Sequence, residues 1–288
     1  MLFLNQKGEI VADPPNLSIL DHGFLFGDSI YEVVRIYQGR FFAWQEHFDR
    51  LERSAGRLKF SFEGLRTNLR PQAEKLVKAF AKPEAALRII ITRGEGILHI
   101  NPTTCKSPQV FMAIWELPAQ ETLKPFRVMI PSVRRNHPRT LDPAIKSGNY
   151  LNSVMAYHEA LDAGYEDALF LSLDDSLCEL TTSNIAWISK STLYTPPLEM
   201  GILKGVTREH FLRVENVKEE AWSWERLGEI DEIFALSTLK ELLPIQELRD
   251  LIGRSYYWKE FHGTMELQAS FRDQLKNSLR SEKELVKI

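Results

Sequence analysis

The sequence predicts an α+β protein built from two α/β domains. Many short strand-like runs alternate with few helical stretches, and they form two blocks separated by a polar, proline-containing stretch at 116–124. No glycine-rich dinucleotide fingerprint follows a strand, so the pattern does not favour a doubly wound parallel sheet. We expect an N-terminal domain at 1–118 and a C-terminal domain at 119–288.

The first block predicts two hairpins, two helices and two long strands. Polar turn pairs at Lys7-Gly8 and Gln38-Gly39 separate strand-like runs, as in β-hairpins. Apolar residues at helical spacing predict a helix over 45–60. A second helical stretch spans 64–82, where Pro71 is expected at a boundary or in an early turn. The strands are expected at 86–94 and 108–117.

The second block begins with a strand at 126–133 and an arginine-rich loop at 134–139, which is expected to be solvated. A helix over about 149–163 is expected to end at Gly164. Another helix is expected to begin at Val206 and Thr207, within the stretch 205–214, and a helical turn is expected after Ser237-Thr238. The remaining strand-like runs are at 167–173, 177–189, 192–197 and 232–237.

The composition is that of ordinary globular material, with 44% hydrophobic and 26% charged residues among 288. The net charge is −3 and we find no basic stripe, so nucleic acid is not an expected partner. Cys105 and Cys178 form no CxxC pattern, which indicates a reducing compartment and no structural metal. No segment resembles a signal peptide or a membrane span, so we expect a cytoplasmic protein without a membrane partner.

Lys146 lies between Ile145 and the small pair Ser147-Gly148, just before the helix that is expected near residue 149. A solvated surface lysine is one interpretation. The other is a nucleophilic amine, because partial burial lowers the pKa of a lysine and leaves it neutral enough to attack a carbonyl. The sequence downstream favours the second interpretation.

Glu179 is the first downstream candidate, on a strand of mostly apolar and small residues. It could face outward. A buried carboxylate would instead suit a cationic ring nitrogen, which a pyridoxal phosphate enzyme needs because a protonated ring accepts electrons.

Two further segments carry groups that suit an anion. Gly205 permits a tight turn before Val206 and Thr207 begin a helix, where free amides and a hydroxyl could bind phosphate. Ser237 and Thr238 end a strand and could form a second such corner. Ordinary helix capping explains either segment equally well.

Arg50 is a third anion-binding candidate. It follows Phe48 on a helix whose apolar face points inward, so its forked guanidinium could clamp a phosphate at the helix edge. A solvated helix arginine is the alternative. Together these residues are the groups that a phosphate-bearing aldehyde cofactor requires.

Over nearly its whole length, the sequence resembles the fold-type IV pyridoxal phosphate enzymes, the class IV aminotransferases. This family includes D-amino acid, branched-chain and (R)-amine aminotransferases and aminodeoxychorismate lyase. The resembling blocks follow in order at 21–42, 46–55, 145–151, 179–187, 193–209 and 237–244.

The resemblance implies a homodimer of two-domain subunits with pyridoxal 5'-phosphate between the domains. It implies that Lys146 forms the Schiff base and moves the proton, and that Glu179 pairs with the pyridine nitrogen. Tyr150 corresponds to a residue that touches the phenolic oxygen of the cofactor. The residues implied to hold the phosphate are Arg50, Val206, Thr207, Ser237 and Thr238.

The substrate is less clearly indicated. Tyr31 lies in a block that resembles the D-amino acid enzymes. Those enzymes hold a carboxylate with an arginine and a histidine, and where that pair would fall this chain has Leu98 and His99, so the arginine is missing and the histidine is displaced. Arg88 lies where some relatives place a strand arginine, and it could hold a carboxylate of glutamate or could face outward. Thr182, beside Thr181, is compatible with the lyase. His47 is expected to hold structure rather than to do chemistry.

We therefore expect an aminotransferase that moves an amino group between an amino acid and a 2-oxo acid, of branched-chain or D-amino acid type. Glutamate and 2-oxoglutarate are the expected pair. The alternatives are aminodeoxychorismate lyase, which eliminates pyruvate, and a catalytically silent family member. No metal is expected at the site.

Overall fold

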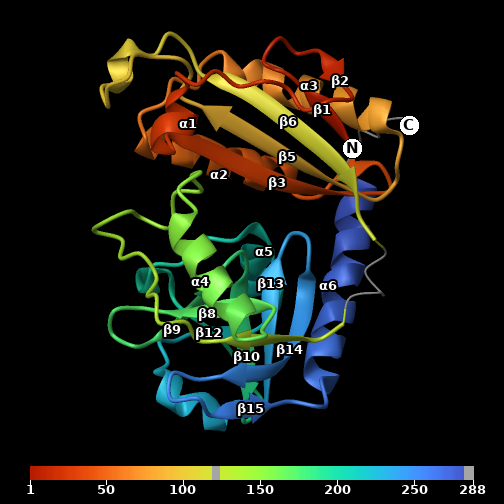
Figure 1. Cartoon of the computed structure of the whole chain (residues 1–288). Helices are drawn as coiled ribbons and strands as arrows, with labels where there is room; N and C mark the ends of the chain where they lie inside the picture. The colour runs from red at the N-terminus through yellow and green to blue at the C-terminus, as the bar shows by residue number, and fades with distance from the viewer. Residues whose placement is uncertain (119–123, 282–288) are drawn as a thin grey trace. The chain divides into compact units, whose positions relative to one another are not determined.

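The computed structural model describes residues 1–118 and 124–281 (Figure 1). The chain divides into two compact units. The first comprises Met1–Ala119, Ile145–Asn149 and Asn277–Ile288, and the second comprises Gln120–Ala144 and Tyr150–Lys276. The domain boundary expected at 118/119 adjoins residues 119–123, which lie outside the described residues. The segment with Lys146 clusters with the first unit, whereas the sequence placed it in the second domain, because its backbone pairs with a strand of the first sheet.

The first unit is built on a six-stranded antiparallel sheet with the order β2-β1-β6-β5-β3-β4. Both expected hairpins are confirmed. Gln38 and Gly39 have φ values of 50° and 76°, the left-handed pair that a two-residue type I′ turn requires. The strands are β1 (Leu2–Leu4), β2 (Ile10–Val11), β3 (Ser29–Tyr37), β4 (Arg40–Phe41), β5 (Ala85–Thr92) and β6 (Gln109–Glu116).

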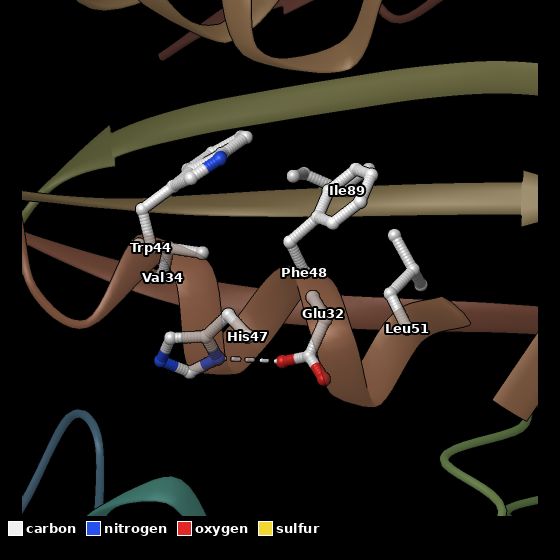
Figure 2. Close-up of a pocket in the computed structure, with 7 residues that line it drawn as sticks. All are labelled: Glu32, Val34, Trp44, His47, Phe48, Leu51 and Ile89. Carbon is white, nitrogen blue, oxygen red and sulfur yellow. Dashed lines mark hydrogen bonds and ion pairs between the residues drawn. The ribbon is translucent and has the colours of Figure 1, made fainter. Parts of the chain in front are cut away.

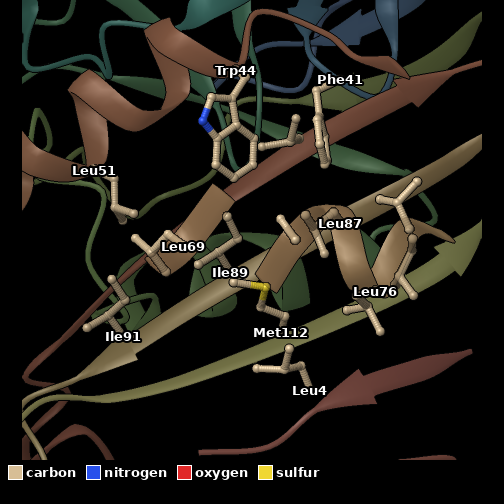
Figure 3. Close-up of a cluster of buried hydrophobic side chains, with 14 of the residues drawn as sticks. Leu4, Phe41, Trp44, Leu51, Leu69, Leu76, Leu87, Ile89, Ile91 and Met112 are labelled. Carbon is tan, nitrogen blue, oxygen red and sulfur yellow. The ribbon is translucent and has the colours of Figure 1, made fainter. Parts of the chain in front are cut away.

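Two long helices contribute to the core of this unit (Figure 3). Alternate residues of β3 point to opposite faces, and Ile30, Val34 and Ile36 join the core with their cross-strand neighbours. Leu51 from one helix and Leu76 from the other join the same cluster. The helices are α1 (His22–Phe26), α2 (Trp44–Arg57) and α3 (Leu65–Phe80), with a 3₁₀ turn η1 (Pro102–Thr104).

Pro71 lies in the second turn of α3, so of the two expected positions the early turn is the one observed, not the boundary. A proline in a helix interior removes one backbone hydrogen bond and costs about 3 kcal/mol. The helix continues past it because Leu69, Ala73 and Leu76 are fully buried. Tertiary packing therefore overrides the local signal for a helix end.

The second unit contains a nine-stranded mixed sheet. Its main path runs β12-β11-β10-β13-β14-β7-β8-β9, and β9 also pairs with β10, so part of the path closes on itself. The strands are β7 (Phe126–Met129), β8 (Asp167–Leu171), β9 (Leu177–Leu180), β10 (Asn184–Ser189), β11 (Thr192–Thr195), β12 (Val217–Glu219), β13 (Glu232–Ser237), β14 (Glu241–Arg249) and β15 (Ser255–Tyr257).

Two expectations for this sheet are corrected. The single run 177–189 is two strands, β9 and β10, joined by a bend at 181–183. The helical turn after Ser237-Thr238 is instead a hairpin turn into β14. The cap-like residues there are outweighed by pairing with β13, which buries Leu242 and Leu243.

Helices α4 (Leu151–Asp162) and α5 (Val206–Val214) confirm the two that the sequence predicts. Gly164, at φ +81°, follows α4 as expected of a residue after a helix end. The helix α6 (His262–Ser281), which belongs to this unit up to Lys276, and the 3₁₀ turns η3 (Leu198–Met200) and η4 (Trp224–Glu229) follow. Within the described ranges, no helix has both the length and the apolar character needed to cross a membrane.

Candidate active site

Lys146 is held against the free edge of β3 in the first unit. Its carbonyl oxygen accepts a hydrogen bond from the Tyr31 amide at 3.0 Å, and its own amide donates to Ser54 Oγ of α2 at 3.2 Å. The Gly148 amide donates to the Ser29 carbonyl at 2.9 Å. A Cβ on Gly148 would lie 2.2 Å from Ser29 Oγ, so any other residue here would displace the Ser29 hydroxyl. The backbone of the lysine is therefore fixed on both sides.

The side chain of Lys146 meets Tyr31. Its Nζ lies 3.3 Å from Tyr31 Oη and 4.5 Å from the centre of the tyrosine ring. The guanidinium carbon of Arg88 lies 4.2 Å from the centre of the same ring. Arg88 pairs with Val33 across β3 and β5, which places it diagonally from Tyr31 on one face of the sheet. Three residues expected at the site thus come together within this unit.

Arg50 is part of a buried ionic cluster with Glu32 and His47; Figure 2 shows the latter two. Its Nε and Nη2 donate to the two oxygens of Glu32 at 2.6 and 2.8 Å. His47 Nδ1 lies 2.7 Å from Glu32 Oε2. All three side chains are almost fully buried. This bidentate pairing gives the guanidinium a defined orientation.

The cluster also sets the protonation of its members. The Arg50 guanidinium and His47 hold the pKa of the Glu32 carboxyl far below its usual value, against the opposing effect of burial. Burial lowers the pKa of His47. Because an ionised carboxylate only accepts hydrogen bonds, the hydrogen of neutral His47 lies on Nδ1 and is donated to Glu32. His47 holds structure, as expected.

The sequence interpretation missed Glu32. A signal was available, because this residue falls between Ile30 and Val34 on the strand face that meets the helices. The cavity beside it measures about 10 Å³ and is lined by Glu32, Val34, Trp44, His47, Phe48, Leu51 and Ile89. Ligand pockets typically measure about 300–1,000 Å³, so this gap is a packing feature and not a cofactor site.

Glu179 is buried in the second unit, on β9. Its Oε2 accepts hydrogen bonds from Asn184 Nδ2 at 2.9 Å and from the Leu203 amide at 3.1 Å. Asn184 also donates to the Leu203 carbonyl at 2.9 Å. A Cβ on Gly205 would lie 2.0 Å from Asn184 Oδ1. Asn184 therefore connects the carboxylate with the residue that precedes α5.

The expectation of a solvated arginine-rich loop is wrong for Arg135. Its Nη2 lies 2.6 Å from Glu179 Oε1, and its side chain is only 14% exposed. The neighbouring Arg134 fits the expectation better, since it pairs with the exposed Asp175. No local pattern distinguishes the two arginines, because the difference depends on a strand more than 40 positions away in the chain.

The start of α5 has a group that suits a phosphate. Val206 and Thr207 occupy its first turn and are buried, as is the Thr207 hydroxyl, which has no hydrogen-bond partner among the described residues. A buried hydroxyl without a partner is destabilising, and a ligand oxygen would satisfy it. The backbone amides at a helix N-terminus also lack partners within the helix, so they favour an anion. These residues fit a phosphate group.

The other expected residues of this unit lie in turns or at a helix start. Ser237 ends β13, and its Oγ accepts a hydrogen bond from the Lys240 amide at 3.1 Å within the turn that contains Thr238. Thr182 is exposed in the bend between β9 and β10, and Tyr150 precedes α4. Thr181 instead donates to the buried Asp167 at 2.6 Å.

Comparison with known proteins places the chain in a family. The family model described as amino-transferase class IV matches residues 29–248. A protein of Methanocaldococcus jannaschii, provisionally named a branched-chain-amino-acid aminotransferase, is 32% identical over 94% of this chain and 95% of its own length. A D-alanine aminotransferase of Bacillus licheniformis is 30% identical, covering 85% of this chain and 86% of its own length. An aminodeoxychorismate lyase of Bacillus subtilis is 28% identical, with 91% of each chain covered.

The fold is shared with solved branched-chain aminotransferases. The enzyme from Escherichia coli has a TM-score of 0.85 at 24% identity, covering all of this chain and 99% of its own. The enzyme from Thermoproteus uzoniensis, with norvaline, has a TM-score of 0.84 at 24% identity and covers 98% of this chain and 96% of its own. The predicted fold class is confirmed. Together with the family match over most of the sequence, these findings show that the chain belongs to the class IV aminotransferases.

Proposed function

We propose that the chain is a pyridoxal 5'-phosphate-dependent aminotransferase that moves an amino group between an amino acid and a 2-oxo acid, with glutamate and 2-oxoglutarate as one pair. The observation that carries this proposal is the contact of Lys146 Nζ with Tyr31 Oη at 3.3 Å, with Arg88 against the same ring. An amine, a phenol and a guanidinium provide a proton carrier and two groups that can hold a carboxylate.

The cofactor fits the residues present. The bound pyridoxal phosphate supplies an aldehyde that captures the amino group and a ring that accepts electrons from the α-carbon. Glu179 would hold the ring nitrogen with its carboxylate, and Arg50 and Thr207 would hold the phosphate. Val206, Ser237 and Thr238 are proposed to add contacts to the phosphate, and Tyr150 to the phenolic oxygen. Solved relatives carry this cofactor or its amine form.

Each residue of the lysine cluster has a proposed role. Lys146 Nζ takes the proton that leaves the α-carbon of the amino acid and returns it on the other side of the reaction. The backbone bonds of Lys146 keep this nitrogen in place, which orientation-dependent proton transfer requires. Tyr31 orients the amine. Arg88 binds a substrate carboxylate through its two-pronged guanidinium, and Thr182 contributes from its exposed bend.

Arg88 favours a dicarboxylic partner. A substrate with a single carboxylate needs one cationic anchor, whereas glutamate presents a second carboxylate that an exposed arginine can bind. The second substrate is proposed to be of branched-chain or D-amino acid type, because relatives with both names align over most of the chain.

A half-reaction screen tests this function. The cofactor-loaded enzyme is mixed with L-leucine, L-glutamate, D-glutamate, D-alanine or (R)-phenylethylamine without an acceptor, and the absorbance of the cofactor is followed. We expect conversion to the amine form with L- or D-glutamate, and no conversion in Lys146→Ala. Borohydride treatment should label Lys146. A wild-type protein that binds no cofactor, or that converts it with no donor, would contradict the proposal.

Aminodeoxychorismate lyase is the second candidate, because a relative with that name aligns over 91% of the chain. A lyase would release pyruvate from aminodeoxychorismate without a keto-acid acceptor. Pyruvate release measured with lactate dehydrogenase, in the absence of any half-reaction with amino acids, would favour this function over transamination.

We propose that the enzyme is a homodimer and that it acts in the cytoplasm. Helix α4 has an apolar stripe at helical spacing, with Leu151, Val154, Met155 and Leu161 exposed by 70%, 44%, 53% and 47%. A second copy of the chain would cover it. Sedimentation of the wild type should give a dimer, and Met155→Glu should give a monomer, whereas Glu159→Gln in the same helix should not. A monomeric wild type would contradict this expectation.

A further inference from the structure

Arg135 is presented to Glu179 by an anchored loop. Its amide donates to the Leu171 carbonyl of β8 at 2.9 Å, and the preceding Arg134 carbonyl accepts from Asn152 of α4 at 3.0 Å. Both bonds are made by the peptide group that joins Arg134 to Arg135, so the loop is tied to a strand and to a helix directly before the Arg135 side chain. Such anchoring limits where the guanidinium can reach.

The contact itself is a short, charge-assisted pair. Arg135 Nη2 and Glu179 Oε1 are 2.6 Å apart, and the two side chains are 14% and 5% exposed. In this setting the attraction is stronger than in water, and removing one partner leaves a buried charge. Arg135 Nε is buried and has no hydrogen-bond partner among the described residues, so the pair with Glu179 is a main polar contact of this guanidinium.

Two other contacts of the carboxylate come from neutral donors. Asn184 and the Leu203 amide both bond Oε2, whereas Arg135 bonds Oε1. The adjacent Cys178 thiol is titratable, but burial raises its pKa, so it stays protonated and adds no charge. Arg135 thus provides a positive charge that can keep this buried carboxylate ionised.

We propose that Arg135 is a positioning residue that keeps Glu179 ionised and oriented for the ring nitrogen of the cofactor. The inference rests on the proposed function, in which Glu179 is the partner of that nitrogen. Without Arg135 a buried carboxylate favours its neutral form, and a protonated Glu179 no longer offers a negative charge to a protonated ring. The effect of the arginine is therefore expected to depend on pH.

The first test needs no cofactor. The protein is labelled with ¹³C at glutamate side-chain carboxyls, the Glu179 signal is identified by its loss in Glu179→Gln, and the signal is followed from pH 4 to 9. We expect Glu179 to titrate at least one pH unit higher in Arg135→Gln than in the wild type, and at an intermediate pH in Arg135→Lys. Arg134→Gln, which removes the neighbouring arginine that pairs with Asp175, should leave the titration unchanged. Equal titration in Arg135→Gln and Arg134→Gln would overturn the proposal.

The second test measures the dissociation constant of pyridoxal 5'-phosphate by fluorescence at pH 6, 7 and 8. Arg135→Gln should bind about tenfold more weakly than the wild type at pH 6 and should recover as the pH rises, because Glu179 ionises again. Arg135→Lys should restore part of the affinity, since it keeps the charge but not the fork. A loss that is the same at every pH, accompanied by a lower melting temperature of the cofactor-free protein, would mean a purely structural role and would also overturn the proposal.

The two tests separate this inference from the proposed function. If the wild type binds no pyridoxal phosphate, the proposed function fails, and the carboxyl titration still shows whether Arg135 keeps Glu179 ionised. If the wild type binds it and the titration is unaffected by Arg135→Gln, the function stands and the role of Arg135 fails.

Discussion

Glu32 in the first unit and Glu179 in the second are both buried carboxylates paired with an arginine, but their partners differ. Glu32 faces two side chains that can carry charge, since Arg50 binds both of its oxygens and His47 binds one. Glu179 pairs with Arg135 through one oxygen and accepts from the neutral donors Asn184 and the Leu203 amide through the other. In the first pair Arg50 is the residue proposed to bind the cofactor, and in the second pair it is Glu179.

The difference shows that an ion pair alone does not reveal which of its members acts. In the first unit Glu32 supports Arg50, because its two hydrogen bonds fix the orientation of the guanidinium. In the second unit Arg135 supports Glu179. Removing Glu32 takes away the carboxylate that binds the buried Arg50 guanidinium, so we expect its largest effect on protein stability. Removing Arg135 leaves Glu179 its two neutral donors, so we expect its largest effect on the binding of the ligand. The following changes test this contrast.

The largest effect is expected from Glu32→Gln. The amide keeps the shape of the side chain but removes the negative charge that pairs with the buried Arg50 guanidinium. We expect the free energy of unfolding to fall by about 3–5 kcal/mol, measured by urea denaturation of the cofactor-free protein. Glu74→Gln is the control, because Glu74 pairs with Arg70 on the partly exposed surface of α3 and should change stability by less than about 1 kcal/mol. An equal loss of stability in Glu32→Gln and Glu74→Gln would show that the buried pair of Glu32 and Arg50 contributes no more to stability than a surface pair.

Acid should destabilise the first unit through the same cluster. The pKa of Glu32 and that of His47 are both lower in the folded protein than in the unfolded chain. The unfolded chain then binds more protons, so the free energy of unfolding falls as the pH falls. The loss begins near pH 6.5 through His47 and steepens below about pH 4.3 through Glu32.

Urea denaturation at pH 7, 5 and 3.5 checks this prediction. Glu32→Gln should lose less stability between pH 5 and 3.5 than the wild type, because the titrating carboxyl is gone. A slope unchanged by the substitution would mean that other carboxyls dominate acid unfolding.

Gly205→Ala should disturb the second carboxylate indirectly. The new Cβ would lie 2.0 Å from Asn184 Oδ1, so Asn184 must move away from Glu179. We expect about tenfold weaker binding of pyridoxal 5'-phosphate, which corresponds to about 1.4 kcal/mol. Gly56→Ala in α2 is the matched control, because a Cβ there meets no atom within 4 Å. The control should bind the cofactor normally and gain up to about 1 kcal/mol of helix stability. Normal binding by Gly205→Ala would argue against the role of Asn184.

The smallest effect is expected from Thr207→Val. The hydroxyl has no hydrogen-bond partner among the described residues, so its removal should leave the melting temperature of the cofactor-free protein unchanged or slightly raised. The cofactor-loaded protein should lose about 1 kcal/mol of binding energy, or about fivefold in affinity. An equal change in both forms would show that Thr207 does not contact the cofactor.

Local patterns predicted much of the fold and part of the site. The two hairpins of the first unit and helices α2, α4 and α5 follow from turn residues and apolar spacing, which act within a few positions. Glu32 and Arg135 were missed for a different reason. Each is one of many charged residues, and its importance comes from a partner on another element that the chain reaches only when folded.

The turn after Ser237 shows the same limit in the fold. The residues after Ser237 predict a helix start from their local pattern. Cross-strand pairing with β13 and burial of Leu242 instead make the segment a strand. Helix propensity contributes about tenths of a kcal/mol per residue, whereas burying one apolar side chain contributes about 1.5–3 kcal/mol. Packing therefore determines the structure of this segment.

By itself the sequence determined the family resemblance, the α+β class and the order of the candidate groups around Lys146, Arg50 and Glu179, because these depend on residue identity and short-range spacing. The tertiary structure alone decided that Glu32 holds Arg50 and that Arg135 rather than Arg134 reaches Glu179. Those choices depend on which side chains share a buried place, where an unpaired charge is too costly to leave alone.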